Sequence, residues 1–140
     1  PITGTEVLVP GRARAPLTGR NLALLAALCG TPYAMRAEGH IVLLEDIREH
    51  PYRIDRMLTQ LLQAGCLDGA AGIALGSWVE CGDALPVLAE RLAPLGVPVI
   101  AGLPIGHGTP QLTVWFGTEA TIDAESCSLI PLFRDPVTAR

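Results

Sequence analysis

A short apolar segment that ends in two acids constrains this chain more than any other feature. Residues 41–44 read Ile-Val-Leu-Leu, and Glu45 and Asp46 follow at once. Such a run, half of it β-branched, is typical of a buried strand, and carboxylates rarely continue one. We therefore expect Glu45 and Asp46 at the carboxyl end of a strand. In open α/β sheets that end is where ligands bind.

A second apolar segment, residues 97–100, leads into a glycine-rich loop with one histidine. The loop reads GLPIGHG over residues 102–108, so His107 lies between two glycines. Because Glu45 and His107 both follow predicted buried strands, we expect them to meet in one cleft. An imidazole held by a carboxylate makes up two of the three members of a hydrolytic triad. Strand alternation turns Asp46 to the opposite face, where we expect it to cap a helix or pair with an arginine.

The remaining pattern predicts an α/β fold with a mixed sheet and about three helices. The predicted helices cover residues 22–29, 51–64 and 83–92, with Asn21 and Asp83 as N-caps of the first and third. The first helix is apolar on nearly every side, which predicts that it is buried. The predicted strands cover residues 6–9, 41–44, 71–75, 97–101, 111–116, 120–122 and 128–132, and residues 135–140 resemble a tail.

The composition is that of a single domain, residues 1–140, with a large apolar content. Of the 140 residues 49% are hydrophobic, and the mean hydropathy is +0.38. No apolar run reaches the ~18 residues that a membrane span needs, so we expect no membrane segment. We expect instead that one apolar face packs against a neighbouring domain. The net charge of −4 and the scattered arginines argue against nucleic-acid binding.

The spacing of cysteines and histidines gives no metal site. Four cysteines (Cys29, Cys66, Cys81 and Cys127) are unevenly spaced without a CxxC pair, so we expect reduced thiols in a cytoplasmic protein. No HExxH-type pattern occurs, and we expect neither a metal nor a cofactor.

The catalytic nucleophile is not evident in the sequence. Ser77, Ser126 and Ser128 lack the setting of a nucleophile elbow, so we expect the nucleophile outside this chain. Asn21 is a weak candidate for substrate contact, and its role as a helix N-cap is the simpler interpretation.

Three motifs together resemble one family of enzymes. They are GTPY at residues 30–33, LLEDIREHPYRIDRML at 43–58 and GLPIGHG at 102–108, approached by the similar segment 10–33. They resemble the C-terminal half of the LD-carboxypeptidases, and the resemblance covers nearly the whole chain. Two departures are Arg20, where the family usually has a second glycine, and residues 12–16, where it has a more glycine-rich stretch.

The resemblance implies a function and a domain arrangement. LD-carboxypeptidases are serine peptidases that release the terminal D-alanine from murein tetrapeptides. By motif, Glu45 and His107 are the second and third members of a Ser-Glu-His triad whose serine lies in an N-terminal domain. The chain begins at Pro1 without a methionine, so we expect an excised, inactive C-terminal domain. The resemblance also implies a homodimer.

Two other functions stay open on the sequence alone. The microcin C self-immunity peptidases are relatives of this family and act on acyl-sulfamoyl adenylates. A small α/β binding or regulatory domain, in which Glu45 and His107 only hold loops, is the alternative from another class.

Overall fold

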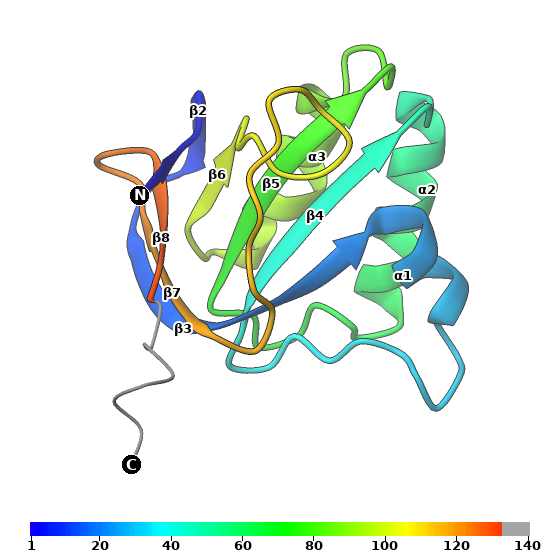
Figure 1. Ribbon diagram of the computed structural model, residues 1–140. Coiled ribbons are helices and arrows are strands. Elements are labelled where there is room, and N and C mark those ends of the chain that lie inside the picture. Colours follow the sequence, from blue (N-terminus) through cyan, green and yellow to red (C-terminus); the bar gives the residue numbers. More distant parts are fainter. Residues whose placement is uncertain (133–140) are drawn as a thin grey trace.

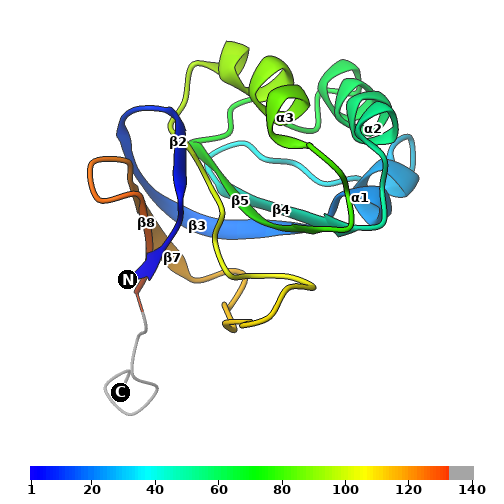
Figure 2. The same ribbon diagram turned by 90° about the horizontal axis from the view of Figure 1, so that it is seen from above.

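The computed structural model describes residues 1–132 and contains one mixed, strongly curled β-sheet with helices on one face (Figures 1 and 2). The sheet has eight strands in the order β1-β8-β7-β3-β4-β5-β6-β2. The strands are β1 (Ile2–Thr3), β2 (Glu6–Val9), β3 (Arg12–Asn21), β4 (Ile41–Ile47), β5 (Gly72–Val79), β6 (Val99–Ala101), β7 (Glu119–Asp123) and β8 (Ser128–Pro131). The helices are α1 (Leu22–Leu28), α2 (Pro51–Gln63), α3 (Leu85–Leu92) and the short 3₁₀ helix η1 (Ala93–Leu95).

Four parallel strands form the centre of the sheet, and antiparallel strands extend both ends. Strands β3, β4, β5 and β6 are parallel neighbours. Strand β2 runs antiparallel to β6, while β7, β8 and β1 continue antiparallel from β3. The α/β class and the mixed sheet are therefore as the sequence predicted.

Two apolar layers lie on the two faces of this sheet. The three α-helices cover one face and pack on the even-numbered side chains of β4, Val42 and Leu44. The other face carries Ile41 and Leu43 and lies beneath the long segment 102–118, seen below the sheet in Figure 2. Strand alternation explains this division, because successive side chains point to opposite faces. Side chains at the carboxyl end of β4 therefore face either the helices or the segment 102–118.

Strand β3 was not predicted. Residues 12–16, expected to replace a glycine-rich stretch, pair antiparallel with β7, and residues 17–21 pair parallel with β4. Arg14 lies on the exposed side and pairs with Glu119 across the ladder at 2.7 Å. Gly19 has a φ of +132° and lies directly against the backbone of Leu43, so a side chain there would collide with β4. Pro16 and Gly19 are unusual in a strand, so the sequence does not indicate one here. In the structure they permit β3 to bend between its two neighbours, β7 and β4.

The helices were largely predicted correctly. Asn21 accepts a hydrogen bond from the Leu24 amide and is the N-cap of α1. Pro51 occupies the first turn of α2, and an ion pair between Asp55 and Arg91 ties α2 to α3. That arginine lowers the pKa of the Asp55 carboxyl.

Other details of the prediction were wrong. Helix α1 is not buried all round, since Leu24 is 54% exposed. Asp83 does not cap α3, which begins after Ala84 without a side-chain cap. Residues 111–116 form no strand: Leu112 bonds to Pro104 and Gly117 to Leu17, so the segment crosses the sheet face and does not join a ladder. Tertiary contacts override the β-propensity of those residues.

Two further expectations concerned a membrane segment and a C-terminal tail. No helix within residues 1–132 is long and apolar enough to cross a bilayer. The predicted tail, residues 135–140, lies outside the described residues.

Candidate active site

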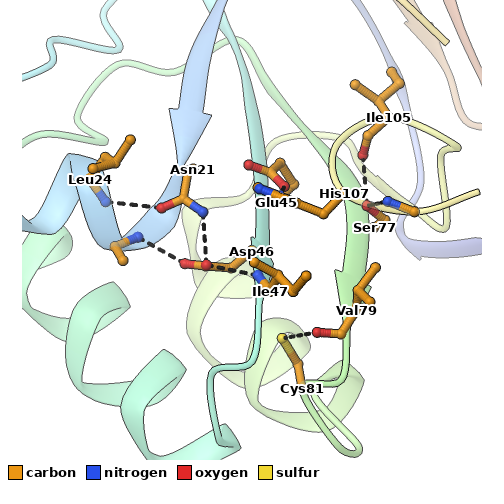
Figure 3. A network of polar contacts seen from close by, with 12 residues as sticks. Asn21, Leu24, Glu45, Asp46, Ile47, Ser77, Val79, Cys81, Ile105 and His107 are labelled. Atoms are coloured by element: carbon orange, nitrogen blue, oxygen red, sulfur yellow. Dashed lines mark hydrogen bonds and ion pairs between the residues drawn. The ribbon is translucent and has the colours of Figure 1, made fainter. Parts of the chain in front are cut away.

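Glu45 and His107 are in direct contact on the face of the sheet opposite the helices (Figure 3). Nδ1 of His107 lies 2.6 Å from Oε2 of Glu45. The Glu45 side chain is only 10% exposed, whereas that of His107 is 46% exposed. This contact agrees with the expectation that the two residues meet in one cleft. Strand β4, however, continues to Ile47, so Glu45 lies within the strand and not at its end.

Glycines allow the histidine loop to approach Glu45 this closely. Gly106 has a φ of +115°, and a methyl group built on it would lie 2.6 Å from Oε2 of Glu45. A side chain at Gly76 would collide with the carbonyl oxygen of Ile105. Gly106 and Gly76 are therefore needed because the histidine loop packs closely against Glu45 and β5, where a Cβ atom would not fit.

This contact determines which nitrogen of His107 is available for chemistry. In the neutral ring, a carboxylate on Nδ1 fixes the proton there and leaves the lone pair on Nε2. Among residues 1–132 the side-chain hydrogen bond of His107 is made by Nδ1, and Nε2 has no hydrogen-bond partner there. A half-exposed imidazole with this tautomer can act as a general base through Nε2.

Asp46 points to the other face and organises the start of α1. Its carboxylate accepts hydrogen bonds from Asn21 Nδ2 at 2.8 Å, from the Ala23 amide at 2.9 Å and from the Ile47 amide at 2.8 Å. Asp46 is 2% exposed. It is thus the helix cap that the sequence suggested, which explains how a second buried acid is tolerated beside Glu45.

A first prediction concerns this buried carboxylate. Asp46→Ala leaves three donors without their acceptor and should lower the free energy of unfolding by about 2–4 kcal/mol. Denaturant unfolding of the 140-residue chain measures this change. Asp83→Ala is the matched control, because it removes the same charge from an exposed residue that caps nothing, and it should change stability little. Equal effects of the two substitutions would contradict the role given to Asp46.

Ser77 is a polar neighbour of the histidine loop, a position that the sequence did not predict. Its Oγ donates to the carbonyl oxygen of Ile105 at 3.2 Å and accepts from the Gly108 amide at 3.0 Å. It makes no hydrogen bond to the His107 ring. Ser126 and Ser128 bond to each other at 2.7 Å, and none of the three serines hydrogen-bonds to the imidazole within the described part of the chain. A Gly-Ser pair inside a strand gave no sequence signal for this contact.

Two cavities flank the histidine loop. One, of about 320 Å³, is lined by Asn21, Glu45, Gly106, Leu112 and Phe116 and so brings the weak candidate Asn21 to the same space as Glu45. The other, of about 490 Å³, lies on the far side of Gly108 beside the start of α3. Glu45 lines the first cavity but not the second, and the side-chain amide of Asn21 is bonded to Asp46 and to the Leu24 amide.

The other titratable groups of residues 1–132 form no metal-binding cluster. No cluster of three or more metal-ligating side chains occurs in residues 1–132. All four cysteines are free thiols in the structure, and burial raises the pKa of Cys66, Cys81 and Cys127.

Comparison with known proteins connects this geometry to one family. The family model described as the LD-carboxypeptidase C-terminal domain matches residues 14–122. A Streptomyces coelicolor protein named as a carboxypeptidase is 50% identical over 131 residues, covering 91% of this chain and 42% of its own length. A Bacillus subtilis protein named as a murein peptide carboxypeptidase is 38% identical over 135 residues, covering 88% of this chain and 41% of its own length.

A solved structure has the same fold. The muramoyltetrapeptide carboxypeptidase of Oxalobacter formigenes superposes with a TM-score of 0.79 at 30% identity, covering 93% of this chain and 47% of that one. The chain therefore spans less than half the length of these relatives.

Proposed function

Since this chain belongs to the family of LD-carboxypeptidase C-terminal domains, we propose that it supplies Glu45 and His107 to the Ser-Glu-His triad of a serine carboxypeptidase. The substrate class is a murein tetrapeptide, and the bond cleaved is the L,D-peptide bond before the terminal D-alanine. The observation that carries this proposal is the 2.6 Å contact between His107 Nδ1 and Glu45 Oε2, which leaves Nε2 unbonded within residues 1–132.

The proposed chemistry follows from the two nitrogens of His107. Nε2 takes the proton of the serine hydroxyl while the serine oxygen attacks the scissile carbonyl. Glu45 stays ionised and stabilises the imidazolium through Nδ1–H. The imidazolium then gives its Nε2 proton to the leaving amino group of D-alanine, and an acyl-enzyme forms. Water, deprotonated by Nε2, hydrolyses this ester and restores the serine.

The serine and the oxyanion donors come, in this proposal, from an N-terminal domain of the full-length enzyme. Exposed apolar side chains on the segment 102–118 support a domain contact beside the triad. They are Leu112, Trp115 and Phe116. Two of them, Leu112 and Phe116, line the cavity that contains Glu45. We further propose that the full-length enzyme is a cytoplasmic homodimer.

The second prediction tests the division of the triad between domains. The 140-residue chain alone should release no D-alanine from a murein tetrapeptide, because none of its described serines reaches His107 Nε2. The full-length enzyme should release it. D-alanine release is measured by chromatography, with the His107→Ala chain as a control for contaminating peptidases. Release by the wild-type chain but not by this control would contradict the prediction.

The same assay separates the substrates that the sequence left open. An acyl-sulfamoyl adenylate offered to the full-length enzyme tests the microcin-type activity. Turnover of the adenylate without turnover of the tetrapeptide would replace the murein substrate in this proposal. Turnover of neither would favour a non-catalytic domain.

A further inference from the structure

Strand β5 contains an irregularity at the point where it faces Glu45. Leu44 of β4 pairs with Leu75 of β5. The next pair joins Asp46, two residues further along β4, to Trp78, three residues further along β5. Gly76 and Ser77 therefore both stand opposite the single residue Glu45, which is the arrangement of a β-bulge. Bulges are frequent beside active sites because the extra residue re-aims a side chain.

The bulge turns Ser77 to the face on which Glu45 lies. In a regular strand Ser77 would share a face with Leu75, which packs in the helix-side core. Instead its hydroxyl lies against the histidine loop: a methyl group built on Gly106 would lie 2.8 Å from Ser77 Oγ and 2.6 Å from Glu45 Oε2. Trp78 returns to the helix side, where it packs against the same core as Leu75. The bulge thus changes the orientation of one polar side chain and then restores the alternation.

The Ser77 hydroxyl joins the two sides of the loop that holds His107. Its one proton goes to the carbonyl oxygen of Ile105, two residues before His107, and its lone pair accepts the amide of Gly108, one residue after. The Ser77 amide also donates to the Ile105 carbonyl at 2.8 Å. Figure 3 shows these contacts beside the Glu45–His107 pair. The hydroxyl therefore holds the loop with both its donor proton and one of its acceptor lone pairs.

We propose that Ser77 is a positioning residue for His107: aimed by the β-bulge, its hydroxyl clamps the loop so that the imidazole stays on Glu45. Its catalytic consequence rests on the proposed function above. Ser77 acts through the loop backbone and does not touch the reacting atoms. Without the clamp, the half-exposed ring of His107 loses its fixed distance from Glu45, and misplacement of a catalytic group by about 1 Å costs on the order of 100-fold in rate.

Nuclear magnetic resonance on the 140-residue chain tests the clamp without any peptidase assay. The probe is the Nδ1 proton of His107, which is protected while Glu45 accepts its hydrogen bond. We expect Ser77→Ala to broaden or abolish this resonance, and Ser77→Cys, whose thiol is a weak donor and acceptor, to have an intermediate effect. Ser126→Ala is the control and should leave the resonance unchanged, because within residues 1–132 the Ser126 hydroxyl is bonded to Ser128 and not to the histidine loop. An unchanged resonance in Ser77→Ala would overturn the proposal; if Ser77→Ala does not fold, an unchanged resonance in Ser77→Cys would do so.

Kinetics of the full-length enzyme test the catalytic consequence. Ser77→Ala should lower kcat about 10- to 100-fold with little change in KM, since the clamp orients a base and does not bind substrate. A wild-type kcat in this variant would overturn the positioning role in catalysis. The two arms separate the proposals: a resonance that depends on Ser77 in an enzyme without peptidase activity supports the clamp and contradicts the proposed function.

Discussion

Replacement of His107 by alanine in the full-length enzyme should lower kcat by about 10³- to 10⁶-fold, because it removes the group that takes the proton from the nucleophile. The chain should remain folded, since the ring is half exposed and, within residues 1–132, makes one side-chain hydrogen bond, to Glu45. Steady-state kinetics with a murein tetrapeptide and a thermal unfolding curve measure the two effects.

His40→Ala is the matched control for this substitution. His40 lies just before β4, at the opposite end of the strand from Glu45, and within residues 1–132 its Nδ1 is hydrogen-bonded to the carbonyl oxygen of Glu38. This control should keep wild-type turnover. Near-normal kcat in His107→Ala would show that His107 is not the base.

The second large effect is expected from Glu45→Gln. The amide keeps the shape of the carboxylate, but its NH₂ group can donate to Nδ1 and so stabilise the tautomer with the proton on Nε2. That tautomer cannot accept the serine proton, and the negative charge that stabilises the imidazolium is lost. We expect kcat to fall by about 10²- to 10⁴-fold with a smaller change in KM.

Glu49→Gln is the control for the loss of one carboxylate near the same strand. Glu49 pairs with Arg53 at 3.6 Å, one helical turn along the chain, and within residues 1–132 it forms neither a hydrogen bond nor an ion pair with His107. It should leave kcat unchanged. If Glu45→Gln behaves like Glu49→Gln, the carboxylate on His107 has no catalytic part.

The sequence predicted those parts of the site that depend on local pattern. The apolar run before Glu45 and the one before the histidine loop correctly placed two parallel strands of the sheet. Period-two alternation also predicted that the two acids face opposite sides of the sheet. Glu45 contacts His107, and Asp46 accepts a hydrogen bond from the first turn of α1. The roles of Glu45, His107 and Asn21 in catalysis and binding remain predictions.

The features of the fold and site that could not be predicted from the sequence depend on strand pairing between distant segments. Strand β3 contains Pro16 and Gly19, which argue against a strand until its two different neighbours, β7 and β4, are known. The bulge at Gly76 arises from the register between β4 and β5, and no local pattern shows a register. For the same reason the sequence does not predict the contact of Ser77 with the histidine loop.

The most direct test of the triad is the distance from His107 Nε2 to the nearest serine Oγ in a crystal structure of the full-length enzyme. We predict a serine of the N-terminal domain at hydrogen-bonding distance, about 2.6–3.2 Å, while Nδ1 stays on Glu45. A structure in which Nε2 is bonded to another group, with no serine within reach, would contradict the assignment of this domain as the carrier of the triad's base.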